Sequence, residues 1–392
     1  MIKFLNLGLQ PLANSYLKKK NLNQKEKKFK LEVAYNSKNH LVSIVNTVPK
    51  EKMFNNKYPY KSSESITMRN SFKELTNKIK KRFRPNFIIE IGSNDGVFLK
   101  NFNKRSIVGV EPCKNLAKMT KIKNYTTYSE YWGMNLARKI TKNKKAELIY
   151  SANTLSHIKN LNEIFRAINF SLSERGVLIL EDPSLLQCIK NIAYDQFYCE
   201  HIYVFSTIAL KNILTNFDLE IFDIQNTTTH GGSNRYFIKK KTNKKYRIKN
   251  SVENEIRKEL KFGLQKISTY KRFAKKVKNS KIKLLNIFRK LKKKQFRIIG
   301  YGATAKSCTV LNYCKIDNKF IDYFYDTTSY KIGSYLPGSK ILIKKYKKLN
   351  KKKIDIAFLG AWNFKEEIFK KEKNYIKKGG KFIIHTPVPK II

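Results

Sequence analysis

A buried strand followed by a glycine-bearing turn constrains this chain more than any other segment. Residues 88–99 have the sequence IIEIGSNDGVFL, which is an apolar run, a tight turn and the start of a helix. Gly92, Asn94 and Gly96 stand at alternate positions of the turn. Glycine lets the backbone approach a ligand, and asparagine is the residue that otherwise best tolerates a positive φ. Free N–H groups at the helix start complete a binding corner, so the segment predicts a nucleoside site in an α/β fold.

The spacing of this turn differs from the G-x-G-x-x-G of dinucleotide sites and is closer to the G-x-G-x-G of methyltransferases. Glu111 ends the next predicted strand, 15 residues after Gly96, where a carboxylate can accept hydrogen bonds from both ribose hydroxyls. An ordinary strand–helix turn is the alternative. We predict an S-adenosylmethionine site formed by Glu90, Gly92, Asn94, Asp95, Gly96, Glu111 and Asn153, with Glu90 and Asp95 facing the ammonium group of the donor.

The rhythm of short apolar runs predicts the architecture. Runs over 87–91, 107–110, 147–151 and 177–180 are separated by stretches long enough for helices, which is typical of βαβ units and a mostly parallel sheet. The same alternation of short apolar runs and longer stretches recurs after residue 295. We predict an α/β protein with two tandem doubly wound Rossmann-like domains: a small irregular N-terminal region over 1–75, a first domain over 76–250, a helical connector over 251–294 and a second domain over 295–392.

The net charge of +53 would suit a nucleic-acid partner. The lysines, however, are spread over nearly every segment and no recognition motif accompanies them, so we expect no specific nucleic-acid partner. A non-catalytic RNA-binding protein stays open through charge alone. A basic field would also attract an anionic nucleotide-sugar.

The five cysteines form no CxxC pair, which argues against a disulfide framework and against a closed zinc site. No apolar run approaches the roughly 20 residues that cross a bilayer, and the N-terminus lacks a signal-peptide pattern. We therefore expect a cytoplasmic protein without a membrane partner.

Few side chains could act as a general base, because the chain has only five histidines. His201 follows Tyr198, Cys199 and Glu200 in a segment rich in aromatic residues. His201 could remove a proton from a carbon beside a carbonyl, while Glu200 orients a neighbour and Tyr198 donates to the enolate oxygen. A surface cluster of polar residues is the alternative for this block.

A second polar segment, THGGSNR over 229–235, places paired glycines beside Arg235. Their N–H groups and the guanidinium could bind an anion, although a glycine turn between strands is equally consistent with the pattern. His157, four residues after Asn153, either contacts substrate or packs. The predicted substrate ligands are His157, His230, Ser233, Arg235, Gly302 and Lys306.

Several blocks together resemble the sugar C-methyltransferases, enzymes that methylate a ring carbon of nucleotide-linked keto sugars. The matching blocks run in order along nearly the whole chain: LGLQPLAN over 7–14, YPYKSS over 58–63, the loop over 90–96, GVEP over 109–112, Glu200-His201, HGGS over 230–233, GYGA over 300–303, PG at 337–338 and AWNF over 361–364.

The resemblance implies a zinc-binding N-terminal region, a central S-adenosylmethionine domain and a C-terminal Rossmann-like domain that helps to hold the substrate. It also implies that Tyr198, Glu200 and His201 belong to a Tyr-His-Glu-His block that supplies the base, with Tyr60 closing over the site.

Two positions depart from the family pattern. Asn36 and Asn39 stand where a pair of zinc cysteines is expected, and asparagine is not a normal substitute for a thiolate, so we predict no metal. Cys199 replaces the first histidine of the catalytic block.

A second glycine loop supports a rival function. Residues 300–305 have the pattern G-x-G-x-x-A after an apolar run, and Asp326 ends the next run 24 residues after Gly302. This is a respectable dinucleotide fingerprint, which makes an NAD(P)-dependent oxidoreductase the alternative function. No obvious proton-transfer residue accompanies the loop, and Lys306 at the helix start suits a substrate phosphate better.

Overall fold

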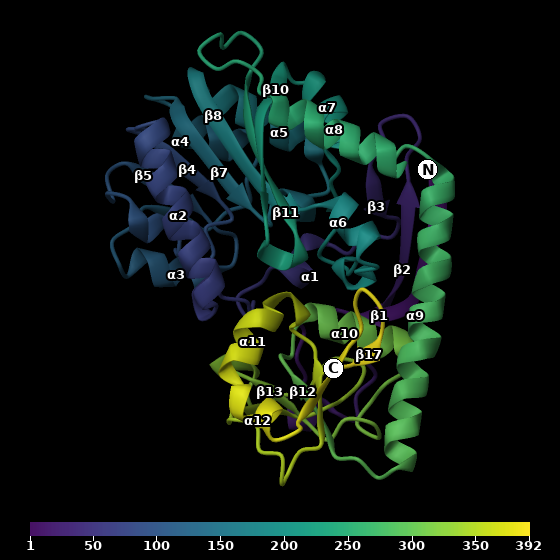
Figure 1. The fold of residues 1–392 in the computed structure, drawn as a ribbon. Helices are drawn as coiled ribbons and strands as arrows, with labels where there is room; N and C mark the ends of the chain where they lie inside the picture. The colour runs from purple at the N-terminus through teal and green to yellow at the C-terminus, as the bar shows by residue number, and fades with distance from the viewer.

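The computed structural model describes all 392 residues, which form three β-sheets. Figure 1 shows the central sheet in the upper part of the molecule and the C-terminal sheet in the lower part, with one long helix running along the side of both. The prediction of an α/β protein with two Rossmann-like units is confirmed. The N-terminal region is more regular than predicted, because it forms a sheet of its own.

The N-terminal sheet is antiparallel, in the order β1-β2-β3-β9. Its first three strands are β1 (Ile2–Pro11), β2 (Lys28–Tyr35) and β3 (Val42–Ile44), and the edge strand β9 (Tyr203–Val204) comes from the central part of the chain. Because β9 starts two residues after His201, the N-terminal region is built directly onto the predicted catalytic block.

The central sheet has the order β10-β11-β8-β7-β4-β5-β6. Its parallel strands are β4 (Ile88–Ile91), β5 (Ile107–Val110), β6 (Thr127–Tyr128), β7 (Ala146–Ala152) and β8 (Leu172–Pro183), and β10 (Leu219–Thr227) and β11 (Ser233–Lys240) add antiparallel strands. One face packs against α2 (Ile66–Arg82). The other face packs against α4 (Met134–Ile140), α5 (Leu161–Ser171) and α7 (Thr207–Thr215).

The C-terminal sheet has the order β14-β13-β12-β15-β16-β17. The strands are β12 (Ile298–Tyr301), β13 (Phe324–Asp326), β14 (Ile343–Lys345), β15 (Ile356–Leu359), β16 (Lys381–Ile384) and β17 (Lys390–Ile391), of which only β17 is antiparallel. The helix α10 (Ala305–Cys314) follows the second glycine loop, and α11 (Lys365–Lys371) and α12 (Lys373–Lys377) follow β15.

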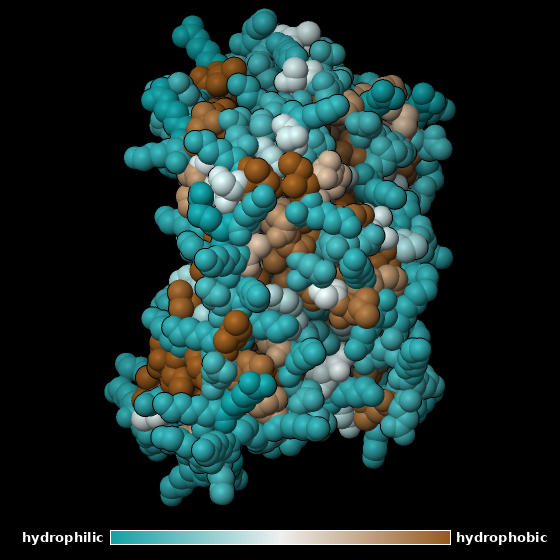
Figure 2. Space-filling model, turned by 90° about the vertical axis from the view of Figure 1, so that its right-hand side faces the viewer, coloured by the Kyte–Doolittle hydropathy of each residue, from teal (hydrophilic) through white to brown (hydrophobic).

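Two helices occupy the predicted connector. α8 (Asn250–Phe262) ends at Gly263, which adopts a left-handed conformation with φ +85°, and α9 (Ile267–Lys293) follows. The face of the molecule on this side is largely hydrophilic, with its apolar side chains in small separate groups (Figure 2). No helix combines the length and the apolar character needed to span a membrane.

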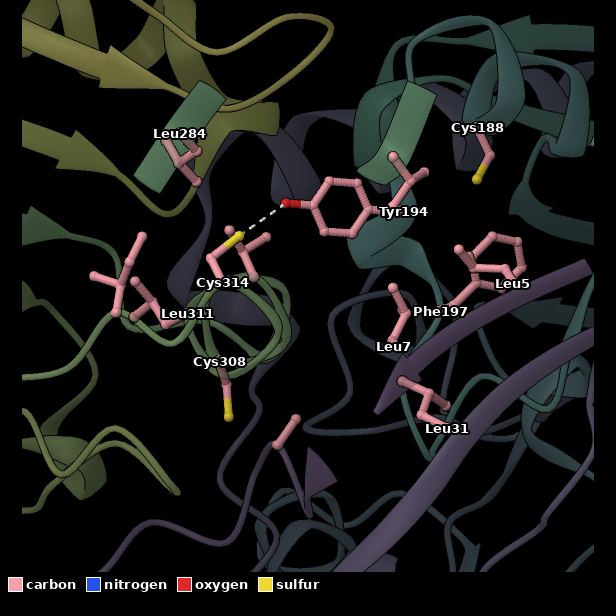
Figure 3. Packing of buried hydrophobic residues seen from close by; sticks show 14 of the residues in the cluster. Leu5, Leu7, Leu31, Cys188, Tyr194, Phe197, Leu284, Cys308, Leu311 and Cys314 are labelled. Carbon is pink, nitrogen blue, oxygen red and sulfur yellow. Dashed lines mark hydrogen bonds between the residues drawn. The ribbon is translucent and has the colours of Figure 1, made fainter. Parts of the chain in front are cut away.

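The largest core cluster joins the three regions rather than filling one of them. Figure 3 shows Leu5, Leu7 and Leu31 of the N-terminal strands close to Phe197, and Leu311 and Cys314 of α10 on the opposite side of Tyr194. The remaining short helices are α1 (Lys50–Met53), α3 (Lys114–Lys121) and α6 (Leu185–Lys190), with 3-10 turns η2 (Ser62–Glu64), η5 (Tyr194–Gln196), η6 (Thr229–Gly231) and η8 (Trp362–Phe364).

Candidate active site

A cavity of about 920 Å³ lies where the central and C-terminal sheets meet. Its walls include Glu111 after β5 and Ala152 at the end of β7, together with Tyr301 and Asp326 at the ends of β12 and β13. Open α/β sheets bind ligands outside the carboxyl ends of their strands. Two such edges therefore share one cavity, and N-terminal side chains line another part of its wall.

The first glycine loop has the positive φ angles predicted from its sequence, but the predicted helix after it is only a 3-10 turn, η3 (Leu99–Asn101). Gly92, Asn94 and Gly96 have φ values of +77°, +49° and +82°. A Cβ on Gly92 would lie 2.1 Å from Oγ1 of Thr154, so only glycine fits. The Glu111 carboxylate holds the loop by accepting hydrogen bonds from the N–H groups of Asn94 and Cys113, each at 2.9 Å.

Three buried carboxyl groups surround this loop without a cationic partner. Glu90, Asp95 and Glu111 are 4–5% exposed, and none forms an ion pair although the protein carries a net charge of +53. Burial, with the charges of Glu111 and Asp95 adding to it, raises the pKa of Glu90 well above its ordinary value. Burial also raises the pKa of Glu111. Because no cation of the protein pairs with these groups, a bound cation would favour their ionised forms.

Several polar atoms in the cavity wall lack a protein partner. Buried polar groups are normally hydrogen-bonded, so these atoms are free to bond to a ligand in the cavity. They are Oε2 of Glu90, Oγ of Ser93, Nε1 of Trp132, Oδ1 of Asn153 and Nε2 of His157. Trp132 was not predicted from the sequence, and its being one of only two tryptophans was the one available signal.

His201 and Tyr198 form a hydrogen-bonded pair in the cavity wall. Nδ1 of His201 lies 2.8 Å from the carbonyl of Gln196; because a carbonyl only accepts, this nitrogen carries the hydrogen. Nε2 then accepts from the phenol of Tyr198 at 2.5 Å. Burial lowers the pKa of His201 well below its ordinary value, which keeps the imidazole neutral. The His157 ring stacks on it with centroids 5.0 Å apart.

Glu200 binds the N-terminal region rather than its histidine neighbour. Its carboxylate accepts from Nδ2 of Asn14 at 2.8 and 3.0 Å and from the phenol of Tyr58 at 3.0 Å. Burial raises the pKa of Glu200 to about 7. Glu200 therefore orients Asn14 and Tyr58 and not His201; both are cavity residues that stood in the matching blocks but were not assigned to the site from sequence.

Residues 58–63 are fastened to the first glycine loop. Asn94 Oδ1 accepts from the N–H of Ser62 at 2.9 Å, and the Asp95 carboxylate accepts from the N–H of Ser63 at 3.3 Å. Tyr60 lines the cavity as predicted, but Asp95 and Gly96 do not. The expected contact of these two residues with the donor is thus corrected: Asp95 holds the covering segment, and Gly96 makes room for Thr120.

The predicted substrate ligands divide into two groups. His157, His230, Gly302 and Lys306 line the cavity. The main-chain carbonyl of His230 accepts from Nζ of Lys306 at 3.1 Å. The ring nitrogen Nε2 of His230 lies 3.2 Å from Nδ2 of Asn153.

Ser233 and Arg235 do not reach the cavity, so their prediction was wrong. Ser233 donates to the carbonyl of Thr229 at 3.0 Å. Arg235 lies on β11 beside β8, where Glu181 is its opposite residue, and the two buried side chains pair at 2.7 Å. Arg235 therefore pairs with the carboxylate of Glu181 and not with an anion of the substrate.

The second glycine loop is held by a carboxylate as the first is, but here the carboxylate pairs with a cation of the protein. Asp326 accepts from the N–H groups of Ala303 at 2.9 Å and Thr328 at 2.8 Å, as Glu111 does in the first loop. Nζ of Lys331 lies 3.2 Å from the same carboxylate and donates to the Ala303 carbonyl at 2.9 Å. This carboxylate therefore has its cation within the protein.

Comparison with known proteins gives consistent matches along the chain. Residues 66–224 match a family model described as "Methyltransferase domain", residues 228–389 match "C-methyltransferase C-terminal domain", and residues 1–54 match "Putative zinc binding domain". The C-methyltransferase NovU of Streptomyces niveus is 26% identical over 394 residues, covering 99% of this chain and 93% of that protein.

Solved structures are similar over part of the chain. An S-adenosylmethionine-dependent methyltransferase from Clostridium acetobutylicum ATCC 824 is 13% identical, with a TM-score of 0.33, over 43% of this chain and 91% of that one. The magnesium protoporphyrin IX methyltransferase ChlM from Synechocystis PCC 6803 is 11% identical, with a TM-score of 0.33, over 43% and 78%.

The N-terminal segment does not fit the zinc ion that its family match implies. Residues 1–54 contain no cysteine, and no group of three or more His, Cys, Asp or Glu side chains in the structure could hold a metal ion. Asn36 and Asn39 accept hydrogen bonds from the N–H groups of Lys38 and Leu41, at 2.9 and 3.1 Å. These bonds shape the turn between β2 and β3 without a metal.

Proposed function

Because the chain belongs to the S-adenosylmethionine-dependent C-methyltransferases, we propose that it methylates a carbon beside the carbonyl of a nucleotide-linked keto sugar. One observation carries the proposal: a single cavity connects the carboxyl groups of Glu90 and Glu111, which have no cationic partner, with the Tyr198–His201 pair. The second glycine loop lies within the match to the C-methyltransferase C-terminal domain, so the oxidoreductase alternative is not carried forward.

We assign the donor to the carboxyl ends of β4, β5 and β7. Glu111 uses one lone pair of each oxygen on the loop and keeps others for the ribose hydroxyls. Glu90 and Asn153 offer unpartnered oxygens to the ammonium group. When bound, the donor supplies an electrophilic methyl group on a cationic sulfur, and the carboxyl groups of Glu90 and Glu111 in the cavity wall favour a cationic ligand over a neutral one.

We assign the nucleotide of the substrate to the C-terminal half of the cavity. An aromatic base and a diphosphate call for aromatic rings and cations. This half offers Tyr301, Tyr325, Tyr346, Phe364, Lys306 and Lys371. Lys306 is buried and its pKa falls to about 8 through burial, so it stays mostly charged at neutral pH, and an adjacent phosphate would favour the charged form further.

We assign the proton transfer to Tyr198 and His201 acting together. The carbon beside the carbonyl loses its proton to this pair, and the resulting carbanion forms the new bond to the methyl carbon as the bond from sulfur to methyl breaks. His201 Nε2 is the acceptor, since Nδ1 is already protonated. The phenol of Tyr198 lies on the route, because its own hydrogen points at Nε2. Proximity and orientation then supply much of the rate.

The test is solvent exchange followed by product analysis. A panel of nucleoside-diphosphate keto sugars is incubated with the enzyme in D₂O, first with S-adenosylhomocysteine and then with methyl-labelled donor. We expect deuterium at one carbon beside the carbonyl and the label on that same carbon by NMR. His201→Asn should slow both by about a hundredfold or more. Label on oxygen or nitrogen, or thermal stabilisation by NAD or NADP instead of S-adenosylhomocysteine, would refute the proposal.

A further inference from the structure

The turn η5 lies between the C-terminal domain and the catalytic block, and all three of its residues are buried. The phenol of Tyr194 lies 3.6 Å from Sγ of Cys314 in α10, as the dashed line in Figure 3 shows. Because Tyr198 and His201 follow η5 directly in the chain, a contact made here is close to the proposed base.

Asp195 receives two side chains from the C-terminal domain. Its Oδ2 accepts from Nε1 of Trp362 at 2.6 Å and lies 3.1 Å from Nε2 of His385. Trp362 starts η8 after β15, and His385 follows β16. Asp195 and His385 are both fully buried. A single carboxylate therefore holds two separate loops of the C-terminal domain against η5.

Gln196 connects this contact with His201, the proposed base. Its side-chain Nε2 donates to the carbonyl of His230 at 2.7 Å, and the same carbonyl accepts from Nζ of Lys306 in α10 at 3.1 Å. Its main-chain carbonyl accepts from Nδ1 of His201 at 2.8 Å. Neither Asp195 nor Gln196 lines the cavity, so any influence on the reaction passes through the residues that they hold.

We propose that Asp195 and Gln196 are positioning residues that make the orientation and tautomer of His201 depend on the seating of the C-terminal domain. The proposal rests on the proposed function, because it takes His201 as the base. The Gln196 carbonyl selects the Nδ1–H tautomer, which leaves Nε2 free to accept. That carbonyl stays in place while the Gln196 side chain and Asp195 are held by His230, Trp362 and His385.

The experiment reads His201 directly by NMR of protein with ¹⁵N-labelled histidine, with His201→Asn used to assign its signals. The variants are Gln196→Leu, which removes the bond to His230, and Trp362→Phe, which keeps a ring but removes the N–H donor to Asp195. Gln187→Leu is the matched control. Gln187 lies in the same region, because a Cβ on Gly232 would be 2.8 Å from Cγ of Gln187. The side chain of Gln187 makes no hydrogen bond, in contrast to that of Gln196.

We expect both variants to change the ¹⁵N shifts of His201 toward mixed tautomers, while the control matches the wild type. With a nucleoside-diphosphate keto sugar, kcat should fall about tenfold or more, a fraction of a typical general-base contribution, with KM within about twofold. Unchanged His201 signals in both variants would overturn the proposal. If the signals change but the wild type shows no C-methylation, the positioning network stands and the proposed function fails. Should Gln196→Leu not fold, Trp362→Phe decides alone.

Discussion

The phenol of Tyr198 donates to Nε2 of His201 over 2.5 Å, so two side chains expected to act separately form one unit. The sequence analysis assigned proton removal to His201 and stabilisation of the enolate oxygen to Tyr198. In the structure the only unprotonated ring nitrogen is already occupied by the phenol hydrogen. A proton from substrate therefore reaches His201 through the Tyr198 oxygen, or else Tyr198 must first turn away.

Tyr198→Phe distinguishes these two routes. If the phenol relays the proton, Tyr198→Phe should slow deuterium exchange beside the carbonyl as strongly as His201→Asn does, by about a hundredfold or more. Donor affinity, measured by calorimetry with S-adenosylhomocysteine, should stay unchanged in both variants. Exchange at the wild-type rate in Tyr198→Phe would make His201 the direct base and remove Tyr198 from the route.

Glu90→Gln tests whether the buried carboxyl groups attract a cationic donor. Burial raises the pKa of Glu90, so part of the free enzyme holds this group protonated, whereas a cationic donor favours the ionised form. The affinity for S-adenosylmethionine should therefore increase as pH rises toward the pKa of Glu90 and level off above it. Glu90→Gln should weaken donor binding and abolish this pH dependence.

The same variant should be more stable than the wild type when no donor is bound. A carboxyl group with a raised folded-state pKa loses stability as pH rises above its ordinary pKa of 4.5, because the folded state holds a proton that the unfolded state has released, and an uncharged amide avoids that cost. Glu259→Gln is the control, since Glu259 is also buried with a pKa raised to about 7 but accepts from Thr207 and Ile208 outside the cavity. Glu259→Gln also serves as the control for donor binding. If it too loses the pH dependence of the affinity for S-adenosylmethionine, that dependence does not come from Glu90.

Local patterns predicted the first glycine loop, and long-range pairing explains what they missed. The positive φ angles of Gly92 and Gly96 and the place of Glu111 follow from a short stretch of sequence. The partners of Glu200 lie 186 and 142 residues away, and no periodicity encodes them. Arg235 was misassigned for the same reason, because its carboxylate sits on a neighbouring strand 54 residues earlier.

The pair of Arg235 and Glu181 should behave as structure rather than as a substrate site. Arg235→Met leaves Glu181 buried and unpaired, which should cost about 3–5 kcal/mol in the free energy of unfolding. Adding Glu181→Gln should recover part of that loss. Arg257→Met is the matched control, because its pair with Glu253 is exposed on both sides, and it should change stability by less than about 1 kcal/mol. Higher KM at unchanged stability in Arg235→Met would return this residue to the substrate site.

Removal of metal ions should leave the N-terminal region intact. The turn between β2 and β3 is held by Asn36 and Asn39, and His40 at that turn bonds the phenol of Tyr35 at 2.5 Å. Prolonged dialysis against a chelator should therefore leave the melting temperature unchanged, whereas His40→Ala should lower it. Stoichiometric zinc in the purified protein, or unfolding on chelation, would contradict this expectation.

Glu200 should give the protein a pH-dependent stability that one isosteric change removes. Its pKa is raised from 4.5 to about 7 by burial, so between these values the folded state holds a proton that the unfolded state has lost. The free energy of unfolding therefore falls as pH rises through this window, by up to about 3 kcal/mol from this group. Glu200→Gln keeps an oxygen for Asn14 and Tyr58 but cannot ionise, so its stability should decline less between pH 5 and 8. Urea unfolding of both proteins across that range measures the difference, with Glu366→Gln at an exposed position as the control. Parallel declines in wild type and Glu200→Gln would show that Glu200 titrates near its ordinary pKa, and that the bonds from Asn14 and Tyr58 outweigh the cost of burial.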